Sequence, residues 1–418
     1  MTNCWNAAAL AATKAVKRPI GRQRPFQAKE LLMRTPCRCS IIPPHILNHL
    51  LSHKDAGVRQ SAFSTLLTNR AMSEQRRFFS IASPTSLATG GCRRTIYDAQ
   101  NTSTLPGKYV RGEGDAATSD AAVGEAYDGA GVTYDFYDEV FARKSIDGNG
   151  MRIDSTVHYQ EDPTEGYDNA FWNGRQMVYG DGDRTVFTSF TRSLDVIAHE
   201  LTHGVTQFEA GLEYHDQPGA LNESFSDVFG SMVKQWKSNQ TVSSADWLIG
   251  RELLVDQSGG RALRSMKAPG TAYMNDPDLG DDPQPDRMSR YLMLANSPAG
   301  DNGGVHINSG IPNRAFYLAC VNLGDSYSWN RAGKIWYATL RSLHATSEFL
   351  DAANATVHFA QQMFGSAAAA AVRQAWQQVE VLQTLAVSVS LPIGAVNPRG
   401  VAAPVPPAPP ANGGPGPA

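Results

Sequence analysis

Two histidines four residues apart, His199 and His203, enclose Glu200 in the run His-Glu-Leu-Thr-His. On a helix, residues four apart lie on the same face, with Cβ atoms about 5–6 Å from each other. Both imidazoles can then reach one ion at Zn–N distances of about 2.0–2.1 Å. Glu200 follows the first histidine directly, so it leans over the open side of the metal. From there it can take a proton from zinc-bound water.

A third ligand must come from another helix, and Glu223 in the stretch 219–227 is the candidate. The pair Asn222-Glu223 begins nineteen residues after His203. Two histidines and one glutamate leave the fourth position to water, which is typical of a catalytic zinc ion. Asp227 follows Glu223 by one helical turn. It is the candidate partner for the second ring N–H of His199, and a surface aspartate is the alternative. This set predicts hydrolysis of peptide bonds.

A His-Glu-x-x-His run also turns up on ordinary amphipathic helices, so its context matters. An apolar stripe of helical spacing accompanies it, and no Pro or Gly interrupts residues 195–203. The stripe consists of Val196, Ile197, Leu201 and Val205. The sequence therefore predicts a helix that presents both histidines on one face.

The stretch 301–310 supplies a second candidate group, His306, after a glycine pair. A cationic imidazole opposite the metal stabilises the negative oxygen that forms during amide hydrolysis. Asp301 is placed to hold that ring protonated, whereas a core histidine bonded to backbone is the alternative. Tyr214 offers a phenol to the same oxygen or packs as an ordinary tyrosine. The aromatic-amide run 169–173 is suited to pair with an extended substrate as an edge strand, or is a buried turn.

The chain of 418 residues, 42% hydrophobic and 18% charged, is long enough for two lobes with a substantial core. Its net charge of −3 gives no reason to expect nucleic acid or an anionic membrane as a partner. No apolar run approaches the roughly 20 residues that span a bilayer. Of the five cysteines, only Cys320 lies in the body of the expected enzyme, so the catalytic part should not depend on disulfides.

The element pattern changes along the chain. Helical periodicity is expected over residues 41–80, short strands from Thr95 onward, and helices after Asp195. The strands include 156–159 and 176–179, and the later helices include 315–321, 330–345, 349–364 and 367–385. Residues 80–91 have the composition of a linker. Residues 392–418 contain nine prolines and one charge, so we expect a disordered or extended tail.

Four motifs in this order resemble the thermolysin-like neutral metallopeptidases. They are Asn-Ala-Phe-Trp-Asn-Gly (169–174), Asp-Val-Ile-Ala-His-Glu-Leu-Thr-His (195–203), Gly-Ala-Leu-Asn-Glu-Ser-Phe-Ser-Asp (219–227) and Asp-Asn-Gly-Gly-Val-His (301–306). The resemblance covers roughly residues 95–385. The run Pro-Pro-His-Ile-Leu (43–47) resembles the short propeptide of the protealysin branch.

The resemblance implies an α+β fold of two lobes, β-rich then helical, with the zinc cleft between them. It implies His199, His203 and Glu223 as zinc ligands, Glu200 as general base and His306, supported by Asp301, as oxyanion stabiliser. It adds Tyr214 as a second oxyanion donor, and Asn169, Ala170 and Arg264 as substrate-binding residues. Phe187, Val196 and Leu263 match the positions that line the specificity pocket. Cleavage is then expected on the amino side of large hydrophobic residues.

One departure concerns calcium. Where the larger relatives carry carboxylates around the motif helix, this chain keeps only Asp195 and Asp246, and has Lys234, Leu248 and Arg251 at other positions. Ca²⁺ takes six to eight oxygen ligands, so calcium at the family's double site is doubtful. We expect an ion pair of Lys234 or Arg251 with Asp195 or Asp246 instead.

The expected organisation has five segments. They are a basic leader or overlong gene start (1–40), a propeptide and linker (41–90), the β-rich lobe (91–208), the helical lobe (209–391) and a Pro-rich tail (392–418). Residues 1–53 hold eight Lys or Arg and one acidic residue, Glu30, without the apolar region of a standard secretory signal. A transit peptide and a true start at Met33 both stay open.

The predicted protein is a secreted, monomeric endopeptidase, made as a zymogen that cuts itself between Arg76 and Gly90. Intracellular retention is the alternative location. Its expected partners are polypeptide substrates and its own propeptide. A non-catalytic zinc or peptide-binding pseudopeptidase, and an adhesion protein with a dormant enzyme core, are the rival functions. The presence of both Glu200 and His306 favours the active enzyme.

Overall fold

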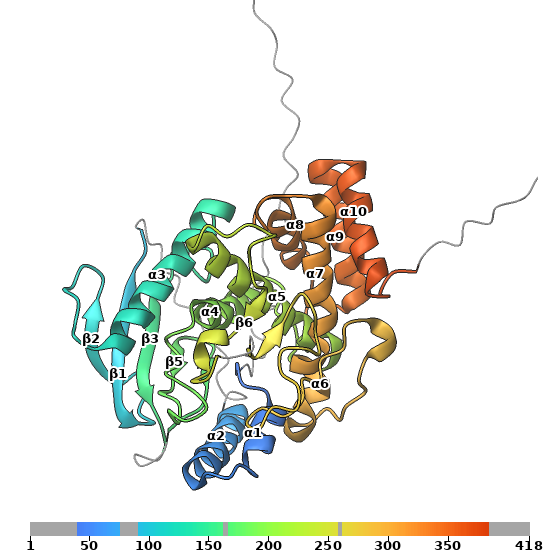
Figure 1. Ribbon diagram of the computed structural model, residues 1–418. Helices are drawn as coiled ribbons and strands as arrows, with labels where there is room; N and C mark the ends of the chain where they lie inside the picture. The colour runs from blue at the N-terminus through green and yellow to red at the C-terminus, as the bar shows by residue number, and fades with distance from the viewer. Residues whose placement is uncertain (1–39, 76–90, 162–165, 258–260, 384–418) are drawn as a thin grey trace, which may run out of the picture. The chain divides into compact units, whose positions relative to one another are not determined.

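The sheet of the protein lies in its N-terminal part and most of its helices follow, in a computed structural model that describes residues 40–75, 91–161, 166–257 and 261–383. Figure 1 shows the sheet at the left, the C-terminal helices at the right and α4 (Leu194–Phe208) with α5 (Asp216–Lys237) between them. The predicted α+β class is therefore confirmed. Residues 1–39, 76–90 and 384–418 lie outside the described residues, and with them most of the predicted leader, most of the linker predicted at 80–91, and the tail at 392–418.

The sheet has the strand order β2-β1-β3-β5-β4. Its strands are β1 (Arg94–Thr102), β2 (Lys108–Gly112), β3 (Ile153–Tyr159), β4 (Ala170–Trp172) and β5 (Met177–Tyr179). β1 pairs parallel with β3, and β3 with β5, whereas β4 runs antiparallel to β5. This places β4, the strand predicted to meet substrate, at one edge of the sheet.

Helix α3 (Ala121–Phe141) was not predicted from the sequence. Asp120 caps it by accepting from the backbone N–H groups of Ala122 and Val123. Glycines inside the helix obscure the helical pattern, since Gly lowers helix propensity. One of them, Gly129, faces α4 so closely that a Cβ there would lie 2.4 Å from Ile197 Cδ1. Close packing against α4 therefore explains why α3 contains Gly129, a residue type that disfavours helices.

Helices α4 and α5 carry the candidate metal ligands, and both are largely buried. Their backbones approach closely at Gly230, where a Cβ would lie 2.5 Å from the carbonyl oxygen of Asp195. The two helices can therefore present their side chains to one shared point.

The C-terminal part consists of helices, as predicted. They are α6 (Asp301–Asn308), α7 (Gly310–Leu323), α8 (Arg331–Leu340), α9 (Phe349–Phe364) and α10 (Ser366–Gln378). Short elements precede them: β6 (Leu248–Ile249), β7 (Arg264–Ser265), and the 3-10 turns η3 (Arg251–Leu253), η5 (Met288–Arg290) and η6 (Pro298–Gly300). The helices predicted at 330–345 and 367–385 end earlier than expected. The second stops at Gln378, just before Glu380 takes a left-handed conformation with φ 62°.

Before the sheet, the chain forms α1 (Pro44–Leu50) and α2 (Ala56–Gln75), in line with the predicted helical region. These helices lie at the bottom of Figure 1. Ile46, Leu47 and Leu50 on α1 are fully buried and belong to the main hydrophobic cluster. The segment therefore shares its core with the rest of the molecule.

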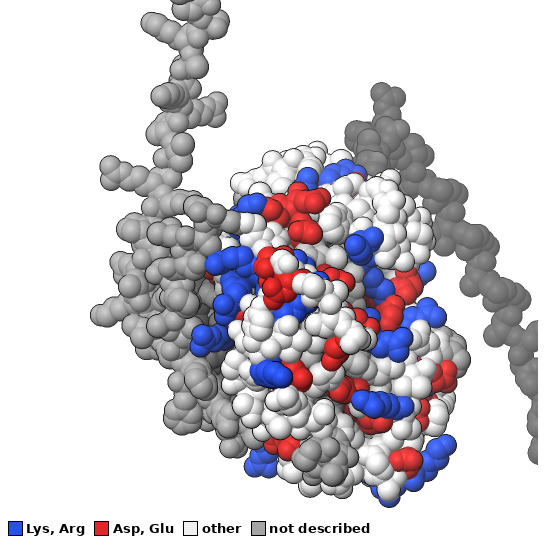
Figure 2. Space-filling view, turned by 90° about the vertical axis from the view of Figure 1, so that its left-hand side faces the viewer, with Lys and Arg blue, Asp and Glu red and all other residues white. Residues whose placement is uncertain are grey.

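Acidic and basic side chains are mixed on the face shown in Figure 2, in keeping with the small net charge. Within the described ranges, none of the helices combines the length and the apolar character needed to cross a membrane.

Candidate active site

The two motif histidines and Glu223 converge on one buried point between α4 and α5. The Nε2 atoms of His199 and His203 lie 3.0 Å apart. Glu223 reaches them from α5, with 3.5 Å from Oε2 to His199 Nε2 and 3.4 Å from Oε1 to His203 Nε2. All three side chains are fully buried.

Hydrogen bonds on the other ring nitrogen fix how each imidazole points. His199 Nδ1 lies 2.8 Å from Asp227 Oδ1, and His203 Nδ1 lies 2.8 Å from Asn222 Oδ1 and 3.0 Å from Ser226 Oγ. Burial lowers the pKa of His199 to about 4 and that of His203 to about 3. Both rings are therefore neutral and turn Nε2 toward the shared point, as metal ligands do.

The donor set fits a zinc ion. Two imidazole nitrogens and a carboxylate are the ligands of catalytic zinc sites. Glu223 Oε2 is buried and makes no hydrogen bond to any described residue. A carboxylate oxygen of Glu200 and one ring nitrogen from each of the two histidines lie within 4.8 Å of one another. Glu200 Oε2 accepts from the backbone N–H of Trp172 at 3.0 Å, which holds the carboxylate toward the edge strand β4.

His306 faces the same point from α6. Asp301 makes two hydrogen bonds with this residue. Its Oδ1 lies 2.5 Å from His306 Nδ1, and its Oδ2 accepts from the His306 backbone N–H at 2.8 Å. Burial opposes the charged ring, but the carboxylates of Asp301 and Glu223 outweigh it and raise the pKa of His306 to about 9. His306 Nε2 lies 3.6 Å from Glu223 Oε2. The result is a cationic imidazole beside the candidate ligand set.

Tyr214 reaches the same point from the loop before α5. Its hydroxyl donates to Glu223 Oε1 and lies 3.2 Å from His306 Nε2. Burial, followed by the Glu223 carboxylate, raises the pKa of this phenol well above its usual value. It therefore stays a proton donor, and it does not merely pack in the core.

Arg264 on β7 forms a fully buried ion pair with Asp227. Nε and Nη2 each lie 2.8 Å from a carboxylate oxygen of Asp227. Asn313 Nδ2 adds a third contact to the same carboxylate at 2.8 Å. Burial would raise the pKa of Asp227, but Arg264 and then His199 hold it well below its usual range. One carboxylate thus orients both a candidate zinc ligand and a candidate substrate-binding arginine.

Residues 40–42 of the chain itself lie beside the candidate site, in contact with Asn169 and with Ala170 on β4. The backbone N–H of Ile41 donates to the carbonyl of Ala170 at 3.3 Å, and that of Ile42 donates to Asn169 Oδ1 at 3.1 Å. The remaining backbone contacts of this segment are His306 Nε2 to the Ser40 carbonyl at 2.8 Å and Arg264 Nη1 to the Ile41 carbonyl at 3.2 Å. Four of the sequence-predicted residues therefore bind one segment of backbone.

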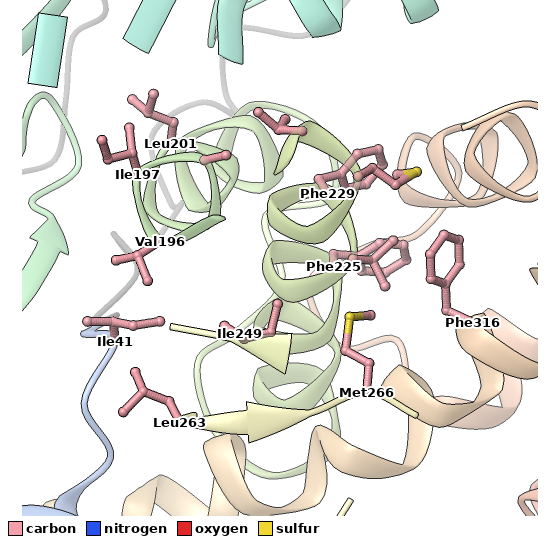
Figure 3. Packing of buried hydrophobic residues seen from close by; sticks show 14 of the residues in the cluster. Ile41, Val196, Ile197, Leu201, Phe225, Phe229, Ile249, Leu263, Met266 and Phe316 are labelled. Atoms are coloured by element: carbon pink, nitrogen blue, oxygen red, sulfur yellow. The ribbon is translucent and has the colours of Figure 1, made fainter. Parts of the chain in front are cut away.

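The Ile41 side chain is packed among buried apolar residues. In Figure 3 it lies between Val196 and Leu263, and none of the three is more than 1% exposed. Phe187 belongs to the same buried cluster. Full burial of an isoleucine side chain contributes about 1.5–3 kcal/mol relative to leaving it exposed. The structure thus places two of the three positions assigned to the specificity pocket, Val196 and Leu263, on either side of Ile41.

The expected ion pairs are present beside the motif helix. Lys234 Nζ lies 3.0 Å from Asp195 Oδ2, and Arg251 lies 3.9 Å from Asp246. Glu252, which the sequence did not single out, adds a second carboxylate 3.2 Å from Lys234. The absence of calcium from this site stays a prediction.

Several supporting residues were missed, namely Trp172, Ser226 and Asn313, and Asn222 was noted without a role. Asn222 and Ser226 flank Glu223 in the same motif, so helical spacing had offered a signal for both. The contribution of Trp172 is a backbone N–H, which residue identity does not reveal.

Comparison with known proteins gives two family matches. Residues 68–207 match the model described as thermolysin metallopeptidase, catalytic domain, and residues 210–381 match thermolysin metallopeptidase, alpha-helical domain. The extracellular metalloprotease of Pectobacterium carotovorum subsp. carotovorum is 49% identical over 348 residues, which cover 82% of this chain and 96% of that protein. Protease PrtS of Photorhabdus sp. (strain Az29) is 43% identical over 347 residues, covering 82% and 91%.

Among solved structures, the precursor of protealysin, a metalloproteinase from Serratia proteamaculans, is similar with a TM-score of 0.73 and 49% identity. That match covers 82% of this chain and all of the other.

Proposed function

This chain belongs to the thermolysin metallopeptidase family of zinc-dependent endopeptidases, and we propose that its zinc ion is held by His199, His203 and Glu223 while Glu200 acts as general base. The observation that carries this proposal is the convergence of two neutral imidazoles and a buried carboxylate on one point. Zinc bound there acts as a Lewis acid and makes water nucleophilic near neutral pH.

Glu200 takes the proton from the attacking water and passes it to the leaving nitrogen. Its position supports both steps, because Oε2 is anchored to Trp172 on the cleft strand and the carboxylate lies beside the two histidines. Proton transfer by a positioned side chain contributes about 10²–10⁴-fold to rate.

His306 and Tyr214 stabilise the negative oxygen of the tetrahedral intermediate. The cationic ring of His306 is held by Asp301, and the Tyr214 hydroxyl lies 3.2 Å from its Nε2. Donors preorganised in a buried site cost no reorganisation during the reaction, and removing one typically lowers kcat by about 10²–10³.

Asn169, Ala170 and Arg264 hold the substrate backbone, and Phe187, Val196 and Leu263 accept the side chain after the scissile bond. The binding of Ser40–Ile42 supports this assignment, since those residues use the same groups. We therefore expect cleavage on the amino side of large apolar residues.

Residues 41–75 are proposed to act as an inhibitory propeptide. They fill the cleft through Ile41 and Ile42, and the similar protealysin structure is that of a precursor. Maturation is then a self-cleavage between Arg76 and Gly90. The name of the Pectobacterium relative supports secretion, and we propose a monomer.

The direct test measures casein hydrolysis by the purified chain, with a zinc chelator and then with zinc restored. Activity should disappear with the chelator and return with the metal, and Glu200→Gln should be inactive while binding one equivalent of zinc. Undiminished hydrolysis by Glu200→Gln would refute the assigned base. A zinc-loaded wild type without peptidase activity would favour the pseudopeptidase.

A further inference from the structure

We propose that the enzyme cuts its own chain between Ser40 and Ile41, within one molecule, so that the residues before Ile41 leave while residues 41–75 stay bound. This inference rests on the proposed function. It concerns a bond well before the window of 76–90 in which the propeptide is expected to be released. The argument depends on the register in which residues 40–42 lie in the cleft.

The Ser40 carbonyl occupies the position of the reacting carbonyl. Its oxygen lies 2.8 Å from His306 Nε2, the group proposed to stabilise the oxyanion. The same nitrogen lies 3.2 Å from the Tyr214 hydroxyl and 3.6 Å from the ligand carboxylate of Glu223. Because this carbonyl belongs to the bond joining Ser40 to Ile41, that bond lies where substrate would be cut.

The residue after the bond is held as a substrate residue. Ile41 donates its N–H to Ala170 and accepts from Arg264 through its carbonyl. Its side chain fills the apolar pocket between Val196 and Leu263 (Figure 3). Isoleucine is among the residues expected after the scissile bond, so both the backbone and the side chain of Ile41 fit a cleavage site.

The sequence itself fixes this register. Sliding the segment one residue further would place Pro43 at Asn169 Oδ1, where Ile42 now donates its N–H, and proline has no N–H to donate. Sliding it the other way would place the hydroxyl of Ser40 in the apolar pocket, where an unpaired polar group is costly. Only the observed register satisfies both positions.

The reaction is hydrolysis, and its balance needs water alone. The water oxygen bonds to the carbonyl carbon of Ser40 and the C–N bond to Ile41 breaks. Glu200 transfers one proton of that water to the Ile41 nitrogen. The second proton of the water also ends on that nitrogen, so the departing peptide ends in the Ser40 carboxylate and Ile41 becomes an ammonium amino terminus.

Contacts beyond the cleft keep residues 41–75 bound after this cut. His45 Nε2 lies 2.7 Å from the Tyr273 hydroxyl, and His53 Nε2 lies 3.1 Å from Asp278. A further contact on α2 joins Ser61 Oγ to Asp168 at 2.7 Å. The first product is therefore expected to remain latent, because its cleft is still filled until the second cut.

The test follows the full chain by intact mass and N-terminal sequencing. To isolate the first step, the four large apolar residues of the second window, Phe78, Phe79, Ile81 and Leu87, are replaced by Gly. This protected chain should acquire Ile41 as its amino terminus at a rate that does not change on tenfold dilution, while hydrolysing no casein. The same chain carrying Glu200→Gln should keep its Ser40–Ile41 bond even when active wild type is added, because its own segment occupies its cleft.

Substitution of Ile41 checks the register. Ile41→Asp should abolish the cut, since the pocket is apolar, whereas the matched variant Ile41→Val should retain it and shows that the segment still docks. An amino terminus at Ile42, or a rate proportional to protein concentration, would overturn the proposal. Wild type that hydrolyses casein while its protected form keeps the Ser40–Ile41 bond would refute this inference alone. Failure of both reactions would refute the proposed function.

Discussion

Asp227 forms a two-point ion pair with Arg264, each oxygen 2.8 Å from a different guanidinium nitrogen, and both side chains are buried. The same carboxylate accepts from His199 Nδ1. His199, the proposed zinc ligand, and Arg264, which binds the Ile41 carbonyl, are therefore both oriented by one anion.

Asp227→Asn should lower both stability and zinc affinity. It leaves Arg264 charged, buried and without its anion, which costs about 3–5 kcal/mol, and loss of the carboxylate behind a ligand histidine weakens metal binding about 10–100-fold. Thermal unfolding with and without zinc, and a metal titration, measure the two effects. Asp246→Asn is the control, because its half-exposed pair with Arg251 is worth about 0–1 kcal/mol. Equal losses in the two variants would contradict the shared role of Asp227.

Variants of the proposed zinc ligands should differ in zinc content from the variant of the proposed general base. His203→Ala and Glu223→Ala each leave two ligands and should lose the metal, whereas Glu200→Gln should retain it and lose turnover. Metal analysis after dialysis, alongside casein hydrolysis, distinguishes these outcomes. Full zinc occupancy in Glu223→Ala would show that the third ligand is another residue.

Cleavage should occur before Leu, Phe, Ile or Val. An apolar pocket gains free energy by burying the side chain after the scissile bond, with discrimination of about 1–3 kcal/mol per methylene. Mass spectrometry of a digested peptide library measures the preference. Val196→Asp should weaken it, and a wild-type profile dominated by charged residues at that position would exclude the pocket assignment.

Release of the propeptide should produce a new amino terminus at Phe78, Phe79, Ile81 or Leu87. These are the large apolar residues between Arg76 and Gly90. Glu200→Gln expressed alone should stay uncut there, and adding active enzyme should trim it in that window. A fully active protein that keeps residues 43–47 on the same chain would refute the propeptide role.

His158 should make stability depend on pH in the alkaline range. Hydrogen bonding to Asp181, aided by Asp120, raises its pKa from 6.5 to about 9. Because the folded pKa is the higher one, its contribution is complete below about pH 6.5 and is lost as pH rises through 9. His158→Asn, which tolerates the left-handed backbone (φ 56°), should lower the melting temperature at pH 6 but hardly at pH 10. A pH-independent difference would contradict this account.

The residues that converge at the candidate site could be predicted from the sequence more completely than the elements and contacts that hold them in place. His199, Glu200 and His203 are set by helical spacing, and neighbouring motifs supplied Glu223 and His306. Helix α3 was missed because glycines at its packed face lower its helical signal. The pairing of Arg264 with Asp227 and with the Ile41 carbonyl could not be read from spacing, since these residues meet only through the tertiary fold.

Lys234 lies beside the motif helix at the place where larger relatives are expected to bind calcium. Its ammonium lies between Asp195 and Glu252, where it supplies positive charge between two segments of the chain. A covalently tethered cation has no dissociation constant, so neither dilution nor a calcium-selective chelator can remove it. We therefore expect the packing of α4 against α5 not to depend on calcium, so that this part of the molecule holds its shape equally in calcium-rich and calcium-depleted fluids.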